Sequence, residues 1–407
     1  MTITINNKNK KTNVPNLRFP EFQGEWEKCE LGKLSTKITK KNKDNLIQNV
    51  LCNSATLGLI PQNDYFDREI ANSNNTDGYY VVEYGDFVYN PRKSVSAPYG
   101  PFNIYTGNEK GIISPLYLCF SVHSILPSFL YYRFKSSAWF SYVYSHGDTG
   151  TRFDRVSIKD DVFFDMPIYM PSQKEQKKIS SLLNLIDERI STQNKIIEDL
   201  KKLKSAIIEK VFNGKHSERL QLDNVGSYIR GLTYSSNDVV EHGGTLVMRS
   251  NNIVNGSLLD YNNNVVFVNK QMSAEQQLQN GDVVICMANG SSSLVGKSSF
   301  YNGSCHSPIT VGAFCGIYRS KEPIVKWLFQ TNKYRRYIWN SLQGGNGAIA
   351  NLNGEDILNM SFSIPNATIK DTCVKMLTSV NSALENNMSL CALYTLQKQH
   401  LLRQMFI

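Results

Sequence analysis

The chain of 407 residues is long enough for two or more domains. With 41% hydrophobic and 11% aromatic residues it can bury real cores, which excludes a disordered protein. No apolar run approaches the ~20 residues of a membrane-spanning helix, and the polar start "MTITINNKNKKTNVP" lacks the apolar core of a signal peptide. We therefore expect a cytoplasmic protein with no membrane partner.

The net charge of +9 favours a polyanionic partner, but the charge is unevenly distributed. The excess of Lys and Arg lies in 1–21, 169–216 and 361–407, whereas 22–168 and 217–360 are nearly neutral. Any nucleic-acid surface on the two large segments must therefore be a local patch.

The eight cysteines form no Cys-x-x-Cys pair, and most lie in apolar runs, where a reduced cysteine acts as a small hydrophobic residue. Cys305 and His306 are the only close pair of possible zinc ligands. We expect no metal site.

The segment 22–168 is predicted to be a mixed α/β domain. "YGDFVYN" (84–90) and "ISPLYLCF" (113–120) combine turn residues with the apolar runs of strands. We expect the aromatic, helix-like stretch 129–144 to form core rather than a base-stacking platform. It leads into the Gly-rich loop "HGDTGTRFDRVSI" (146–158).

A long amphipathic helix is predicted over 173–212, with seam residues spaced by four and three as in a heptad repeat. Pro171 sets its start. At 40 residues it would span ~60 Å. The seam consists of Ile179, Leu183, Ile186, Ile190, Gln193, Ile197, Leu200, Lys204, Ile207 and Val211.

This seam pattern returns 194 residues later, after Pro365. The polar interruptions recur too, since Asn387 corresponds to Gln193 and Lys398 to Lys204, so chance periodicity is a poor explanation. The second seam is Cys373, Leu377, Val380, Leu384, Asn387, Cys391, Tyr394, Lys398, Leu401 and Met405.

The repeat extends upstream of the helices. "NGDVVIC" (280–286) matches 84–90, and "ITVGAFCG" (309–316) matches 113–120 with Cys315 over Cys119. A second Gly-rich loop, "LQGGNGAIANLNG", occupies 342–354.

The repeat predicts an α+β fold in which two mixed α/β domains are separated by two long, antiparallel coiled-coil helices, related by a pseudo-two-fold. Such a dumbbell suits a ligand with two similar, separated subsites. The predicted segments are an N-terminal arm (1–21), a first domain (22–168), a central spacer helix (169–216), a second domain (217–360) and a C-terminal spacer helix (361–407).

These segments and their order resemble the specificity subunit of a type I restriction-modification system. The resemblance covers nearly the whole chain and rests on the order of its parts rather than on any single motif. The matching stretches are "RFPEFQGEWEKCELGKL" (18–34), "GDTGTRFDRVSIKD" (147–160), "MPIYMPSQKEQKKISSLLNLIDERI" (166–190), "LVMRSNNIVNGSL" (246–258) and "GDVVICMANGSSSLVGK" (281–297).

Two departures stand out. The second helix has Ile369-Lys370 where the first has Glu175-Gln176, so contact with a partner there is expected to differ. "NPRKSVSAPYG" (90–100) stands in place of the second domain's "ANGSSSLVGK" turn, so the two domains are expected to read different sequences.

The resemblance implies two target recognition domains, each of which reads half of a bipartite site in double-stranded DNA. It implies two modification subunits, which carry S-adenosylmethionine and methylate adenine, and two restriction subunits, which use ATP and Mg for translocation and cleavage. It implies no cofactor in this chain. Half-sites read from one face are offset by ~34 Å, for which a helical spacer is a plausible ruler.

Candidate DNA-binding residues are polar and cationic side chains in loops after strands, because Arg and Lys read guanine and Asn and Gln read adenine. Each can equally be a turn-forming or solvated residue. In the first domain they are Asn90, Arg92, Lys93, Ser94, Tyr99, Thr149, Arg152 and Arg155. In the second they are Arg249, Asn251, Asn252, Asn289, Ser291, Ser292, Lys297, Gln343 and Asn346.

No catalytic residues are predicted, because neither a methylase tetrad nor a phosphate-binding loop is present. Asn90-Pro91-Arg92-Lys93 matches only the first two residues of the tetrad. In "GSSSLVGK" (290–297) the first glycine is one residue too far from the Gly-Lys pair of a phosphate-binding loop. Two alternatives remain open. One is a stand-alone DNA-binding or scaffold protein without methyltransferase partners. The other is a carboxylate-Lys nuclease, although no convincing Asp…Glu-x-Lys set follows a strand pair.

Overall fold

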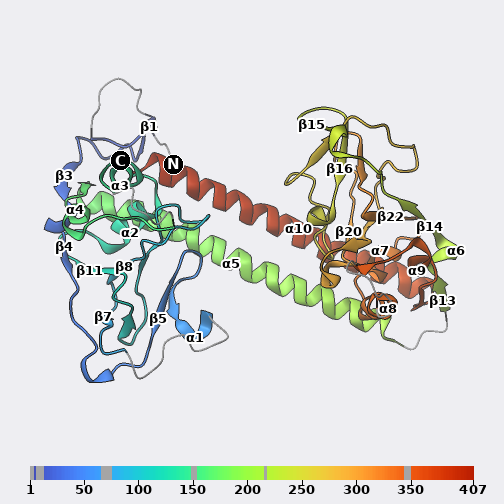
Figure 1. Cartoon of the computed structure of the whole chain (residues 1–407), viewed down its shortest axis with the longest axis horizontal. Coiled ribbons are helices and arrows are strands. Elements are labelled where there is room, and N and C mark those ends of the chain that lie inside the picture. Colours follow the sequence, from blue (N-terminus) through green and yellow to red (C-terminus); the bar gives the residue numbers. More distant parts are fainter. Residues whose placement is uncertain (1–3, 6–12, 66–75, 148–153, 215–217, 343–349) are drawn as a thin grey trace. The chain divides into compact units, whose positions relative to one another are not determined.

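The structure, a computed structural model, describes residues 4–5, 13–65, 76–147, 154–214, 218–342 and 350–407 (Figure 1). The chain forms two compact units. Unit 1 comprises Met1–Asn194 and Ser389–Ile407, and unit 2 comprises Lys195–Met388. Each of the two long helices, α5 (Gln173–Phe212) and α10 (Ala367–Gln404), therefore contributes one part to each unit. Over the described residues, every helix is too short or too polar to span a bilayer.

The centre of unit 1 is a four-stranded antiparallel sheet in the order β4-β11-β8-β9. Its inner strand β8 is buried at all three residues, because both faces of the sheet are covered. The bounds are β4 Ser35–Lys37, β11 Leu118–Val122, β8 Phe87–Tyr89 and β9 Phe102–Ile104.

Shorter pairs of strands surround this sheet. They are β1 (Thr4–Ile5) with β2 (Leu17–Arg18), β3 (Glu27–Glu30) with β12 (Pro167–Met170), β5 (Leu51–Ser54) with β6 (Gly58–Pro61), and β7 (Tyr80–Val82) with β10 (Gly111–Ile113). The short helices are α1 (Gln62–Tyr65), α2 (Pro127–Lys135), α3 (Phe140–His146) and α4 (Asp160–Phe164).

Aromatic residues form the core of unit 1. Phe102 of β9 stacks on Phe134 of α2 with ring centroids 3.9 Å apart, and Trp139 meets Phe102 edge to face. Burial of such a ring contributes ~1.5–3 kcal/mol. Phe129, Tyr132, Phe134 and Trp139 are all buried, which confirms that most of the stretch 129–144 is core.

Unit 2 repeats the sheet of unit 1. Its four antiparallel strands have the order β14-β22-β18-β20. Position by position, β14 therefore corresponds to β4, β22 to β11, β18 to β8 and β20 to β9. The bounds are β14 Gly226–Arg230, β22 Cys315–Ser320, β18 Val283–Cys286 and β20 Ser298–Phe300.

A second sheet of unit 2 has the order β15-β17-β16-β21, with β16 and β21 parallel. Unit 1 shows the equivalent parallel contact as a bridge between Val50 and Ile112. The bounds are β15 Val239–Val240, β17 Val266–Val268, β16 Thr245–Met248 and β21 Ile309–Val311.

The other elements of unit 2 are short. The paired strands are β13 (Glu218–Gln221) with β24 (Ser361–Ile364), and β19 (Ala288–Asn289) with β23 (Ala350–Asn351). The helices are α6 (Leu222–Val225), α7 (Val325–Leu328), α8 (Asn332–Leu342) and α9 (Gly354–Leu358).

Strand register corrects one detail of the repeat. Cys119 lies opposite Val88, whereas Cys315 lies opposite Cys286. Val284 is the counterpart of Val88, and the residue opposite Val284 is Ile317. Cys119 therefore corresponds to Ile317 rather than to Cys315.

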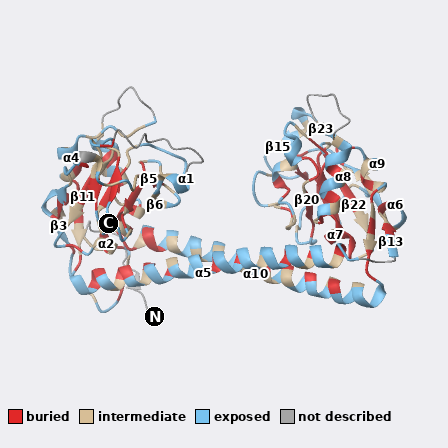
Figure 2. Ribbon diagram, turned by 90° about the horizontal axis from the view of Figure 1, so that it is seen from below, coloured by how far each residue is buried: buried red, intermediate tan, exposed pale blue. Residues whose placement is uncertain are grey.

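The long helices contribute buried residues to the core of each unit, visible as red segments in Figure 2. In unit 1, Leu183 of α5 joins the same core as Leu401 and Met405 of α10. In unit 2, Leu377 of α10 packs with Ile208 and Phe212 of α5. The heptad pattern favoured burial of Ile207 and Val211, but these two residues are only partly buried. Ile208 and Phe212 are buried instead, because they pack into the core of unit 2.

Candidate nucleic-acid interface

Unit 1 brings the two groups of sequence-predicted residues together. The backbone N–H of Lys93 donates to the carbonyl of Asp154 at 2.8 Å, and the N–H of Val156 donates to the carbonyl of Pro91 at 2.8 Å. Arg92 and Arg155 form a β-bridge between these segments. The loop 90–100 after β8 thus lies against residues 154–156, in the C-terminal part of the Gly-rich loop.

Local hydrogen bonds shape the loop 90–100. The Asn90 side-chain oxygen accepts from the N–H of Arg92 at 3.0 Å, and the Ser94 hydroxyl oxygen accepts from the N–H of Ala97 at 3.1 Å. Gly100 has φ +87°, and a Cβ there would collide with the carbonyl oxygen of Asn90. Asn90 and Ser94 are therefore turn-forming residues.

The remaining first-unit candidates differ in their availability. Arg92 and Lys93 are exposed, and Arg92 lies 3.9 Å from the carboxylate of Asp154. Tyr99 is half-buried against Trp139 and Phe140, so its ring belongs to the core. Thr149 and Arg152 lie outside the described residues.

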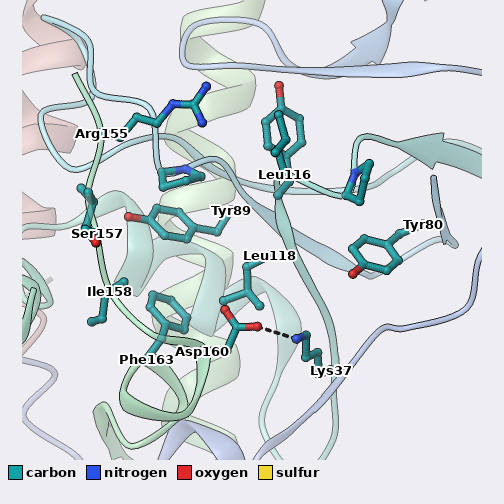
Figure 3. A pocket seen from close by; sticks show the side chains of 14 residues that line it. Lys37, Tyr80, Tyr89, Leu116, Leu118, Arg155, Ser157, Ile158, Asp160 and Phe163 are labelled. Atoms are coloured by element: carbon teal, nitrogen blue, oxygen red, sulfur yellow. Dashed lines mark hydrogen bonds and ion pairs between the residues drawn. The ribbon is translucent and has the colours of Figure 1, made fainter. Parts of the chain in front are cut away.

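A pocket of about 450 Å³ adjoins these loops (Figure 3). Arg155 lies at one end, and the ion pair between Lys37 and Asp160 lies at the other. Burial raises the pKa of Tyr117, whose phenol lines the pocket and stays neutral at physiological pH. The lining residues are Lys37, Tyr80, Tyr89, Pro91, Pro115, Leu116, Tyr117, Leu118, Arg155, Val156, Ser157, Ile158, Asp160 and Phe163.

Unit 2 assembles the equivalent loops. The strand pair β19–β23 places Asn289 opposite Ala350, in the C-terminal part of the second Gly-rich loop, as Arg92 is placed opposite Arg155 in unit 1. The Asn289 side-chain amide donates to the hydroxyl of Ser250 at 3.3 Å. Ser291 and Ser292 are exposed. Gln343 and Asn346 lie outside the described residues.

A pocket of about 470 Å³ in unit 2 contains no acidic residue among the described side chains that line it. Arg249 and Asn251 lie on its wall, so the pocket presents one cationic group and one side-chain amide. Its lining comprises Tyr234, Ser235, Ser236, Arg249, Ser250, Asn251, Gly312, Ala313, Phe314 and Cys315.

Asn252 is a correction to the predicted set. Its side chain is only 1% exposed. Its oxygen accepts from the N–H of Arg249 at 2.9 Å, and its amide donates to the carbonyls of Asp260 and Asn263 at 3.0 and 2.7 Å. These three hydrogen bonds all lie within the loop, so Asn252 is a structural residue.

Arg335 on α8 is a candidate that sequence reasoning missed. It lines a further pocket of about 260 Å³ together with Lys297 and Ser292. The available signal was the adjacent cationic pair Arg335-Arg336, flanked by Tyr334 and Tyr337 in the sequence.

The described residues contain no group of three or more His, Cys, Asp or Glu side chains arranged to hold a metal. Burial raises the pKa of the thiols of Cys119, Cys286 and Cys315. These cysteines therefore remain protonated and pack as small apolar residues.

The two motifs near the ends of the first large segment meet in space. Arg18 forms a bidentate ion pair with Glu175, at 2.7 and 2.8 Å, and the Trp26 indole N–H donates to the same carboxylate at 3.3 Å. Gln176 accepts from the N–H of Leu126 at 2.9 Å. The Glu-Gln pair therefore anchors the start of α5 inside unit 1.

Protein-family models give no match to this sequence. Over 158 residues the chain is 33% identical to the type I restriction enzyme EcoKI specificity subunit of Escherichia coli strain K12, and over 156 residues it is 32% identical to the StySPI specificity subunit of Salmonella potsdam. Each match covers 36% of this chain and 31% of the relative.

The chain resembles type I restriction specificity subunits. This confirms the resemblance predicted from the motifs. The fold agrees, since the S subunit of a type I restriction-modification system from M. genitalium superposes with a TM-score of 0.59 at 14% identity, covering 97% of this chain and 99% of that chain. The curated specificity subunits share only about a third of their length with this chain.

Proposed function

We propose that this chain is a specificity subunit that binds double-stranded DNA through both units and reads one half of a bipartite site with each. The internal repeat carries the proposal. In both units, the residues after the third strand of the sheet pair with the C-terminal part of a Gly-rich loop, and cationic or amide side chains lie beside that contact. A ligand with two related subsites suits such a repeat.

The two half-sites are expected to differ in sequence. The first unit presents Arg92, Lys93 and Arg155, which are all cationic, whereas the second presents Arg249, Asn251 and Asn289. Guanine edges favour arginine and lysine, and adenine edges favour asparagine. The first half-site is therefore expected to be richer in guanine contacts.

Catalysis is assigned to partner subunits. We propose two modification subunits that bind S-adenosylmethionine and methylate adenine, and two restriction subunits that use ATP and Mg. The chain itself needs no cofactor in this scheme. The parts of α5 and α10 are proposed to continue as an antiparallel coiled coil that sets the gap between half-sites.

Antiparallel pairing is supported within unit 1. Lys398 pairs with Asp187 and Cys391 donates to Asn194 at 3.4 Å, so residue numbers fall along α10 as they rise along α5.

The test is a genome-wide map of methylated adenines. The chain is co-expressed with the modification subunit encoded beside it in an unmethylated host, and methylated adenines are mapped by long-read sequencing. A split motif with a fixed gap is the expected result. An uninterrupted motif would contradict the proposal that each unit reads one half of a bipartite site. Absence of methylation, together with a soluble chain that does not co-purify with the modification subunit, favours a stand-alone DNA-binding or scaffold protein.

A further inference from the structure

The same tight turn connects a peripheral strand to the central sheet in both units. In unit 1 it joins β10 to β11, and the N–H of Tyr117 donates to the carbonyl of Ser114 at 3.1 Å. In unit 2 it joins β21 to β22, and the N–H of Cys315 donates to the carbonyl of Gly312 at 2.8 Å. The residue before each donor, Leu116 or Phe314, occupies the tip.

Both tips expose a large apolar side chain. Leu116 is 64% exposed and Phe314 is 69% exposed. The surrounding sequences, "SPLY" and "GAFC", share no residue at matched positions, yet each has a bulky hydrophobic group at this place. Single exposed hydrophobic residues are common, but recurrence at one position of an internal repeat points to a shared contact.

Each tip lies among the candidate DNA-binding groups of its own unit. Leu116 and Arg155 line the same pocket, and Figure 3 shows them away from the Lys37–Asp160 pair. Phe314 lines the pocket that contains Arg249 and Asn251. The exposed apolar groups are thus bordered by cations, which complement phosphates, and by an amide that can pair with adenine.

The tip of unit 2 is held rigidly. The carbonyl of Phe314 accepts from the N–H of Met287 at 2.9 Å and from the N–H of Ala288 at 3.1 Å. These bonds fix the backbone of Phe314 beside β19, the strand that contains Asn289. An apolar side chain on a backbone held in this way can contact a base edge without the cost of ordering the turn.

We propose that Leu116 and Phe314 are equivalent specificity-determining residues, each of which contacts the 5-methyl group of a thymine in the major groove of its own half-site. The inference rests on the proposed function, because it requires that both units read DNA. Thymine alone among the bases presents a methyl group in the major groove, so an apolar contact there distinguishes it from cytosine.

The test uses the assembled chain and modification subunit on duplexes that carry the methylated motif. Each thymine is replaced in turn by uracil, which lacks only the methyl group. In each half-site one replacement is expected to weaken binding about fourfold, the factor for burial of one methyl group. Leu116→Ala is expected to abolish that effect in one half-site, and Phe314→Ala in the other.

The two variants control each other, since each leaves the opposite half-site unchanged. Tyr84→Ala is a further control, because Tyr84 is also exposed but lies in the turn at the opposite end of β8. Uracil effects that survive both tip variants, or a motif with no thymine sensitivity, overturn the inference. Uniform loss of affinity in both half-sites also overturns it. If the unaltered complex methylates no split motif, the proposed function itself has failed.

Discussion

Inside unit 2, the ammonium group of Lys204 on α5 donates a hydrogen bond of 2.7 Å to the side-chain oxygen of Asn381 on α10. The counterparts of these residues in the repeat are Lys398 and Asp187, which form an ion pair of 2.5 Å inside unit 1. The same helix–helix contact thus occurs in both units. Its chemistry differs, because unit 1 supplies a carboxylate and unit 2 a neutral amide.

This difference predicts a pH dependence of unit 2. Burial lowers the pKa of Lys204 to about 8 from the ordinary 10.5, although Glu385 acts in the opposite direction. Between these values the unfolded chain binds more protons than the folded chain, so stability rises with pH. From pH 7 to pH 9 the contribution of Lys204 to the free energy of unfolding should increase by about 1 kcal/mol.

Urea unfolding at pH 7 and pH 9 measures this contribution. The free energy of unfolding of Lys204→Met should rise by about 1 kcal/mol less from pH 7 to pH 9 than that of the unaltered chain. Lys195→Met, at an exposed position of the same helix, should keep it. An equal pH dependence in all three proteins would refute the assignment.

The Arg18–Glu175 pair predicts an asymmetry between the two long helices. Glu175 is 1% exposed, so Glu175→Gln leaves the Arg18 guanidinium buried without its counter-ion, at a cost of ~3–5 kcal/mol in unfolding free energy. Its counterpart Ile369 is 51% exposed, and Ile369→Ala should change stability by less than ~0.5 kcal/mol. Thermal unfolding of both variants checks this; comparable losses would contradict the anchoring role.

Asn251 and Asn252 are adjacent and should behave differently. Asn252→Ala leaves a backbone N–H and two carbonyls without their partner and should lower the unfolding free energy by ~1–3 kcal/mol. Asn251→Ala should leave stability intact and weaken binding of the second half-site about tenfold, as expected for one base contact. Urea unfolding and duplex binding separate the two effects, and the reverse pattern would show that the roles have been exchanged.

The proposed spacer predicts an effect of helix length. Removing one heptad from matched positions of α5 and α10 shortens a continuous helical pair by ~10 Å, and the gap in the methylated motif should shrink accordingly. Removing the heptad from α5 alone should abolish assembly with the modification subunit, because the facing residues lose register. Mapping of methylated adenines distinguishes these results. An unchanged gap in the matched deletion would contradict the proposal that the helical pair sets the distance between the half-sites.

Much of the secondary structure was predictable because its signals are local. The 3.6-residue periodicity of 173–212 predicts α5, and its echo predicts α10, from neighbours along the chain alone. The apolar runs that became β8 and β18 were recognisable for the same reason. Comparison of the two halves also predicted that they would have the same arrangement of elements. The matching strand orders of the two antiparallel sheets agree with this.

The sequence by itself determined the long helices α5 and α10, the buried strands β8 and β18, and the polar loops that follow those two strands. Only the tertiary structure decided that Asn252 is buried while Asn251 is exposed, and that Leu116 and Phe314 are exposed although they are apolar. It also decided that Ile208 and Phe212 are buried in the core, whereas Ile207 and Val211 pack against it only partly buried. The physical reason is that burial depends on contacts between residues far apart in the chain, and periodicity carries information only about residues close together.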